Sequence, residues 1–237
     1  MSKRAIILLK VLLHLLCLAP LAWLLHLFTS GRLATYADPV NYITHFTGDW
    51  TIYILLTSLA ITPIRRLATS LGFLIRFRRL IGLYAFFYAT LHLATYIFLF
   101  SGYDITTALA GLRAGHPAAL VTQWKLIWPG MVDDVLKRRF IQVGLFAWIL
   151  LLALACTSPA FIMRSMGGKN WQLLHRLVYL AAFAGIVHYW WLVKVGNLSP
   201  WKDTVVLTIL LLARVAYTAM KRLKKPTPIP LSSNSPS

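Results

Sequence analysis

The sequence predicts an all-α integral membrane protein, a bundle of six transmembrane helices with both termini in the cytoplasm. Three observations predict it: an apolar composition, six apolar segments, and basic residues in alternate loops. Of 237 residues, 59% are hydrophobic and 13% are charged, whereas soluble domains average about 45–50% and about 25%. The net charge of +18 lies in short loops between apolar runs. This pattern indicates membrane topology and not nucleic-acid binding.

The apolar segments are long enough for about six helices of roughly 20 residues each. They cover approximately residues 6–28, 50–64, 80–100, 140–162, 173–195 and 203–220. The first follows SKR, but it exceeds the roughly 7–15 residues of a signal-peptide core and no A-x-A site follows it. We therefore expect a retained span. The second is short if it stops at Pro63, and a start near Thr44 would lengthen it.

The charged residues predict the orientation of the spans. Arginine and lysine gather at the start of the chain, in alternate loops and after the last span, so these parts are assigned to the cytoplasm. All six acidic residues are aspartates, and they fall on the opposite side. Lys137, Arg138 and Arg139 depart from this pattern, but they belong to the long outer segment 101–139, where the rule is weaker.

The domain organisation follows from these spans. Residues 1–225 are expected to form one membrane domain with membrane lipid around it, and the Pro- and Ser-rich residues 226–237 a disordered cytoplasmic tail. The outer segment 101–139 has room for a short helix lying on the membrane. It serves either as a connector or as a docking surface for an outer partner, and the sequence leaves both open.

Three histidines inside the apolar segments are the candidate functional residues: His92, His175 and His188. Intramembrane ionisable residues are costly and usually functional, and neutral imidazole is a good ligand for iron. His92 lies 8 residues and His188 lies 7 residues from the outer ends of two spans that run in the same direction. Matched depth predicts that the two imidazoles clamp one haem iron. The chain lacks C-x-x-C-H, which excludes covalent c-type attachment.

A second level of polar residues is predicted nearer the cytoplasm. His175 precedes His188 by 13 residues, or roughly 20 Å on a helix, and Arg78 precedes His92 by 14. Arginine cannot ligate iron, but it can hold a haem propionate, a flavin phosphate or a quinone oxygen. Thirteen residues rotate an ideal helix by about 220°, so His175 and His188 face different neighbours unless Gly185 permits a distortion. A second iron site at His175 therefore stays open.

Two stretches carry a family resemblance. RRLIGLYAFFYATLHLATY and GGKNWQLLHRLVYLAAFAGIVHYWW, with the six-span layout, resemble the haem-binding membrane subunits of the bacterial protein-methionine-sulfoxide reductase system (the MsrQ/YedZ family). Those subunits resemble the transmembrane part of ferric reductases. The resemblance implies b-type haem on His92, His175 and His188. The relatives have a second histidine low on the third span, where this chain has Arg78. A bound FMN is implied by the resemblance alone.

The function that the resemblance implies is electron transfer across the bacterial inner membrane. Electrons would come from the quinone pool or a cytoplasmic flavin reductase. They would go to a separate periplasmic molybdenum-cofactor enzyme that repairs methionine sulfoxide in oxidised proteins. The chain itself lacks a soluble domain for that catalytic site.

Two other hypotheses for the function remain open. A quinone-linked cytochrome b subunit of a different dehydrogenase would share the same site. A transporter with structural histidines would need polar or broken spans, and the nearly acid-free spans argue against it.

Overall fold

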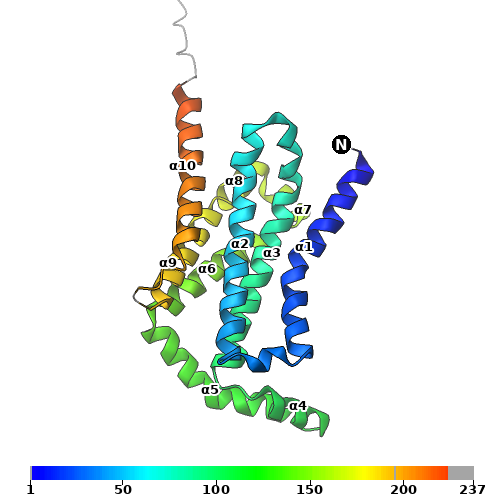
Figure 1. Ribbon diagram of the computed structural model, residues 1–237, viewed down its shortest axis with the longest axis vertical. Coiled ribbons are helices and arrows are strands. Elements are labelled where there is room, and N and C mark those ends of the chain that lie inside the picture. Colours follow the sequence, from blue (N-terminus) through cyan, green and yellow to red (C-terminus); the bar gives the residue numbers. More distant parts are fainter. Residues whose placement is uncertain (1, 195, 224–237) are drawn as a thin grey trace, which may run out of the picture.

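The computed structural model describes residues 2–194 and 196–223, and every regular element within them is helical. Figure 1 shows the helices arranged as an elongated bundle, with the start of α1 and the end of α10 at the same end. The expected tail at 226–237 lies outside the described residues.

Six helices correspond to the six predicted spans. These are α1 (Lys3–Thr29), α2 (Pro39–Leu67), α3 (Ile75–Thr95), α6 (Arg139–Cys156), α9 (Leu177–Leu192) and α10 (Trp201–Leu223). Four further helices lie between them: α4 (Ile105–Arg113), α5 (Ala118–Lys137), α7 (Ala160–Met166) and α8 (Gly168–Leu174). Short 3-10 turns cover Arg32–Thr35 and Thr69–Leu74, and a π-helical turn covers Tyr96–Phe100.

Four of the helical stretches are long and apolar enough to cross a membrane. They are Lys3–Thr29, Ser70–Phe100, Arg139–Cys156 and Trp201–Leu223. The chain is therefore a multi-pass membrane protein by length and composition. Helix α9 has only 16 residues, about 24 Å at 1.5 Å per residue, against about 30 Å of bilayer hydrocarbon. The count of six spans and the cytoplasmic termini stay predictions.

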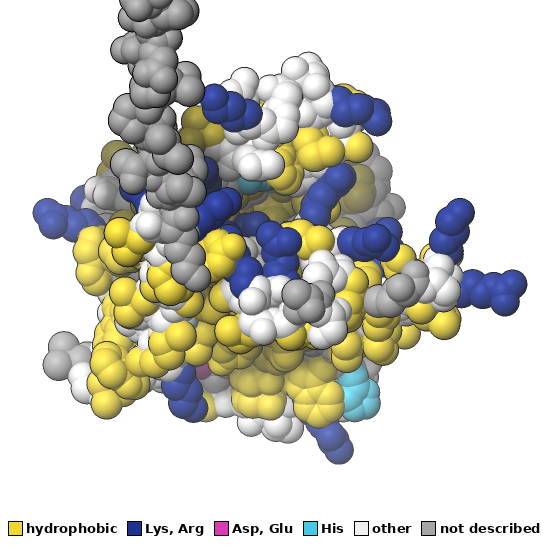
Figure 2. Space-filling view, turned by 90° about the horizontal axis from the view of Figure 1, so that it is seen from above, with side chains coloured by type: hydrophobic (Ala, Val, Ile, Leu, Met, Phe, Trp, Pro, Cys, Tyr) yellow, Lys and Arg dark blue, Asp and Glu magenta, His cyan; other side chains and the backbone are white. Residues whose placement is uncertain are grey.

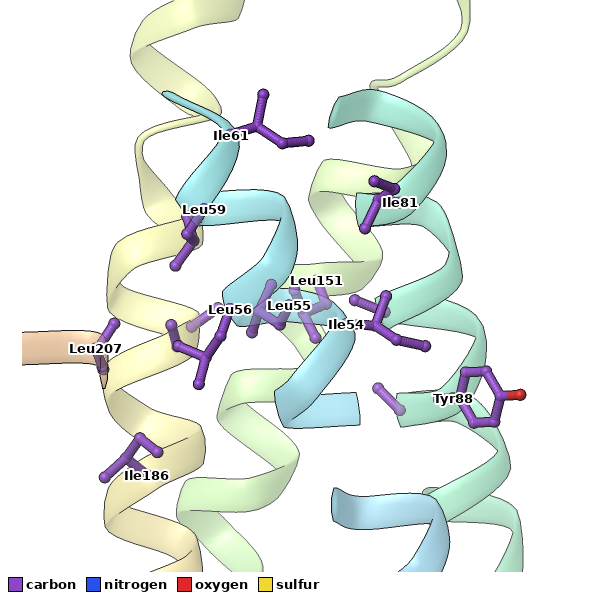
Figure 3. Close-up of a cluster of buried hydrophobic side chains, with 14 of the residues drawn as sticks. Ile54, Leu55, Leu56, Leu59, Ile61, Ile81, Tyr88, Leu151, Ile186 and Leu207 are labelled. Atoms are coloured by element: carbon purple, nitrogen blue, oxygen red, sulfur yellow. The ribbon is translucent and has the colours of Figure 1, made fainter. Parts of the chain in front are cut away.

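Two antiparallel helix pairs form the centre of the bundle. Helix α2 packs along α3, and α6 packs along α9; the pairs meet where α3 contacts α6 and α2 contacts α9. Buried aliphatic side chains from these helices fill the space between them, as Figure 3 shows for Leu55, Leu59, Ile81, Leu151 and Ile186. Helices α1 and α10 lie at the periphery.

Tyrosine hydroxyls attach α1 to α3. The buried Tyr88 hydroxyl donates to the Cys17 carbonyl at 2.8 Å and accepts from the Leu21 amide at 3.1 Å. The hydroxyl oxygen of Tyr84 lies 2.6 Å from Nδ1 of His14. Tyr88 thus inserts into the backbone hydrogen bonding of α1 next to Pro20, where a helix bends most easily.

Helix α2 begins before both starts predicted for the second span, residue 50 and the alternative near Thr44. Helix α2 begins at Pro39, because Asp38 caps it by accepting from the Asn41 amide at 2.9 Å and proline suits a first helical turn. It continues through Pro63 to Leu67. Helices packed in a bundle tolerate an internal proline when neighbours satisfy the freed backbone groups.

The continuous helix predicted over 173–195 is also wrong. Helix α8 ends at Leu174, a turn holds His175 and Arg176, and α9 begins at Leu177. The segment predicted over 140–162 likewise stops at Cys156. Trp171 in α8 donates its indole N–H to the Thr157 carbonyl at 2.8 Å. This bond holds α8 against the end of α6 and redirects the chain.

Candidate functional site

His92 and His188 meet in the middle of the helix bundle. His92 lies on α3 and His188 on α9, and their ring centroids are 6.0 Å apart with the ring planes at 80°. The sequence-based expectation that the two rings lie at matched depth is confirmed by this distance.

The His92 ring rests against helix α2. Its Nδ1 lies 3.0 Å from the Thr44 carbonyl oxygen. One turn further along α2, Gly48 leaves the room that the ring occupies: a Cβ there would be 3.1 Å from Cε1 of His92. The side chain is therefore oriented by a backbone acceptor and by a missing side chain.

The His188 ring rests against helix α6 in the same way. Its Nδ1 lies 2.7 Å from the Phe140 carbonyl oxygen. A Cβ on Gly144 would lie 2.6 Å from Nδ1 of His188, closer than real Cβ contacts. Glycine is thus required at position 144 for this ring position.

The two arrangements are repeats of each other. In both, the histidine follows its carbonyl acceptor by 48 residues and its glycine by 44. Each antiparallel pair, α2–α3 and α6–α9, supplies one glycine and one histidine. The two pairs run in the same direction, which is the geometry of a parallel repeat related by an axis along the bundle.

These hydrogen bonds fix which ring nitrogen carries the proton. A carbonyl oxygen only accepts, so Nδ1 of each histidine must donate, and each Nε2 keeps its lone pair. Such second contacts are typical of metal-binding histidines. Two metal–nitrogen bonds of about 2 Å each, plus the two rings, give a centroid separation near the observed one. Among the described residues no group of three His, Cys, Asp or Glu could hold a metal ion.

His175 lies away from this pair, at the turn between α8 and α9. Its ring packs on Trp171 with the centroids 3.8 Å apart, and its Nδ1 is buried without a hydrogen-bond partner among the described residues. The positive charge of Arg78 acts on the His175 ring, and among the described residues no second histidine ring packs against His175. A shared cofactor site for His175 and Arg78 stays a prediction.

Arginines surround this second location. Arg214 on α10 lies close enough to four others for their charges to repel: Arg78, Arg66, Arg176 and Arg65. Nε of Arg65 is buried and lacks a partner among the described residues. Basic side chains are spread over this end of the molecule in Figure 2. These arginines are half-buried or exposed, and none of them forms an ion pair among the described residues. Such a cluster of cations fits a ligand that carries negative charge.

Sequence reasoning missed the two glycines and most of these arginines. Gly48 and Gly144 carry no motif, and only their common spacing to His92 and His188 could have signalled them. The sequence alone shows charges in loops or at helix ends for Arg65, Arg176 and Arg214. They approach one another only because α2, α9 and α10 pack together.

Comparison with known proteins places the chain in a family. The model of the ferric reductase like transmembrane component matches residues 30–186. A protein-methionine-sulfoxide reductase heme-binding subunit MsrQ from Herminiimonas arsenicoxydans is 41% identical over 208 residues, 84% of each chain. The chain belongs to the MsrQ family.

Other MsrQ proteins support the same assignment. One from Xanthomonas oryzae pv. oryzae is 40% identical over 226 residues, covering 94% of this chain and 90% of the relative. One from Ralstonia nicotianae is 40% identical over 190 residues, covering 80% and 74%. No solved structure matches the chain. The ferric reductase match contains α2, α3 and α6 and ends two residues before His188.

Proposed function

We propose that this MsrQ-family chain is a membrane electron-transfer subunit that holds a b-type haem between His92 and His188. The observation that carries the proposal is the facing pair of rings, 6.0 Å apart, whose Nδ1 atoms are both engaged by backbone carbonyls. Each Nε2 is then left with a free lone pair, and two such imidazoles are the donor set that bis-imidazole ligation needs. The names of the relatives, which are heme-binding subunits, support it.

The haem supplies a carrier that takes up and releases one electron at a time. The chain's own contribution is to hold the two imidazoles in fixed tautomers and to exclude water with the aliphatic core around them. At the other location, Arg78 and His175 are proposed to hold a negatively charged cofactor group. A haem propionate, the phosphate of FMN or the oxygen of a quinone would suit the arginines there.

The proposed direction of transfer is across the bacterial inner membrane, through a six-span bundle with cytoplasmic termini. Electrons would come from the quinone pool or a cytoplasmic flavin reductase. They would leave to a periplasmic molybdenum-dependent subunit that reduces methionine sulfoxide in proteins. The relatives' name describes one subunit of a protein-methionine-sulfoxide reductase, which implies a catalytic partner.

The test uses the purified full-length chain in detergent. A low-spin Soret band with about one haem per chain or more by pyridine haemochrome is expected. After reduction with dithionite, adding an oxidised methionine-sulfoxide protein alone should leave the spectrum reduced. Reoxidation should begin only when the soluble partner is added. Reoxidation without any partner would make this chain the catalyst. Reoxidation by an unrelated soluble reductase alone would favour the alternative, a cytochrome b subunit of another enzyme.

A further inference from the structure

Five arginines converge at the end of the bundle where α2 ends and α3 begins. The charges of Arg78, Arg66, Arg176 and Arg65 all act on Arg214 of α10. The five side chains come from α2, α3, the turn before α9, and α10. Figure 2 looks onto this end and shows Lys and Arg side chains in its middle as well as at its edge. We call these five residues the arginine cluster.

No acidic side chain of the protein offsets this charge. The sequence has six acidic residues, all of them aspartates. Four cap a helix or pair with a basic neighbour: Asp38, Asp104, Asp133 and Asp134. Asp49 precedes Arg65 by 16 residues, roughly 24 Å along α2, and Asp203 precedes Arg214 by 11 residues, roughly 16 Å along α10. A counter-charge for the arginine cluster therefore has to come from a ligand.

The same end holds the buried polar side-chain atoms that lack a hydrogen-bond partner. Within residues 2–194 and 196–223 these atoms are Oγ1 of Thr62, Nε of Arg65 and Nδ1 of His175. Thr62 and Arg65 lie in the last two turns of α2, and His175 lies at the turn between α8 and α9. A buried donor without an acceptor is costly. The polar groups at this end are thus not satisfied by the protein alone.

Two of the arginines are held in place by aromatic rings. Arg66 of α2 stacks on Tyr217 of α10, with its Cζ 3.7 Å from the ring centroid. Arg214 of α10 stacks on Tyr179 of α9, with its Cζ 4.5 Å from the ring centroid. Stacking uses the face of a guanidinium group and leaves the N–H groups at its edge, which can donate in pairs to a phosphate. Both arginines are therefore oriented without an acceptor for their donors.

Apolar side chains flank these two arginines along α2 and α10. The exposed ones within six residues of Arg66 or Arg214 include Ile64, Leu67, Leu212, Val215 and Met220. Helix α10 is long and apolar enough to cross a membrane, so its exposed side chains would face the hydrocarbon of the bilayer. A ligand with both a phosphate and hydrocarbon chains matches the arginines and the apolar side chains together. A free phosphate or a nucleotide would match the arginines alone.

We propose that the arginine cluster binds the head group of an anionic phospholipid. Arg66 and Arg214 hold a phosphate, and the acyl chains lie along the exposed apolar side chains of α2 and α10. Basic sites between transmembrane helices at the cytoplasmic side suit such head groups, and this is the end that the sequence assigns to the cytoplasm.

The site should prefer a head group with two phosphates. Four other cations act on Arg214, and one phosphate offsets less of this repulsion than two do. Diphosphatidylglycerol is therefore expected to bind more tightly than phosphatidylglycerol. Arg78, whose charge acts on His175, stays with the cofactor group of the proposed function. Lipid binding at Arg66 and Arg214 does not depend on that function.

The experiment titrates the delipidated full-length chain in detergent with three lipids of the same acyl chains and counts bound lipids by native mass spectrometry. Diphosphatidylglycerol should bind at least about tenfold more tightly than zwitterionic phosphatidylethanolamine, with phosphatidylglycerol between them. The double variant Arg66→Gln with Arg214→Gln should bind diphosphatidylglycerol about tenfold more weakly or worse, because charge-assisted hydrogen bonds are lost. Arg222→Gln is the matched control, since Arg222 lies in the last turn of α10 and is not among the charges acting on Arg214.

Further measurements keep the outcome decisive. Arg66→Lys with Arg214→Lys keeps both charges and should retain part of the affinity that the glutamine variant loses. The haem-free variant His92→Ala should still bind the lipid, which separates this proposal from haem ligation. Inorganic pyrophosphate and FMN are added as competitors and should leave the lipid bound. Displacement by either of them, equal affinity for the three lipids, or full binding by the glutamine variant would overturn the proposal.

Discussion

Gly144 and His188 are in contact across the α6–α9 interface, and the contact leaves no room for a Cβ on the glycine. The distance from that Cβ to Nδ1 of His188 would be 2.6 Å. The ring takes the place of a side chain and reaches the Phe140 carbonyl behind it.

Gly144→Ala is therefore expected to displace the imidazole and weaken haem binding by about tenfold or more, since overpacking costs about 1–3 kcal/mol. Gly185→Ala is the matched control, because a Cβ at Gly185 meets nothing within 4 Å. Haem per chain and the Soret band would be measured for both. Normal haem content and spectrum in Gly144→Ala would show that α6 shifts to accept the methyl group, and that the glycine does not position the ring.

His92→Ala and His188→Ala should each reduce haem at this site to near zero, because each removes one of two facing imidazoles. The exposed His116 offers the control His116→Ala. Added imidazole should partly restore the low-spin spectrum in the two site variants. Full haem content with an unchanged spectrum in either variant contradicts the pairing.

Arg78→Ala should slow reduction by a cytoplasmic donor by about tenfold while the His92–His188 haem stays in place, because a charge-assisted hydrogen bond is worth about 1.5–3 kcal/mol. Stopped-flow reduction and haem content are compared, with Arg222→Ala near the end of α10 as the control. A proportional loss of both quantities would assign Arg78 to folding.

Asp104 should keep α4 capped in acid. The hydroxyls of Thr106 and Thr107 and the Thr107 amide donate to its carboxylate, which holds the pKa of Asp104 well below its usual range. With a lowered folded pKa, the stabilisation is present at neutral pH and is lost only as pH falls through that lowered value. Hydrogen exchange of the Thr107 amide should stay protected at about pH 4, near the ordinary carboxyl pKa. In Asp104→Ala protection should be lost at every pH.

The sequence predicts those features that depend only on how far along a helix a residue lies. The meeting of His92 and His188 follows from residue counts at a constant rise along two helices that run in the same direction. The helix start at Pro39 was not predicted, because the first turns of α2 contain polar residues such as Asn41 and Thr44 and therefore lack the hydrophobicity expected of a span.

Contacts between residues far apart in the chain could not be predicted from the sequence. The break at His175–Arg176 divides a segment predicted as one continuous helix, and a hydrogen bond from Trp171 to the distant Thr157 accompanies it. The pairing of Gly48 with His92 and of Gly144 with His188 joins positions 44 residues apart. Only the packing of neighbouring helices shows which of the chain's glycines face a ring.

The attachment of α1 has a consequence for the order of assembly. Helix α1 is synthesised first, yet the hydroxyls that hold it belong to Tyr84 and Tyr88 of α3. Until α3 has been inserted, the bent segment around Pro20 has to keep its backbone groups satisfied within lipid. These hydrogen bonds between α1 and α3 can therefore form only after α3 has entered the bilayer, and until then α1 has to be stable there as a separate helix.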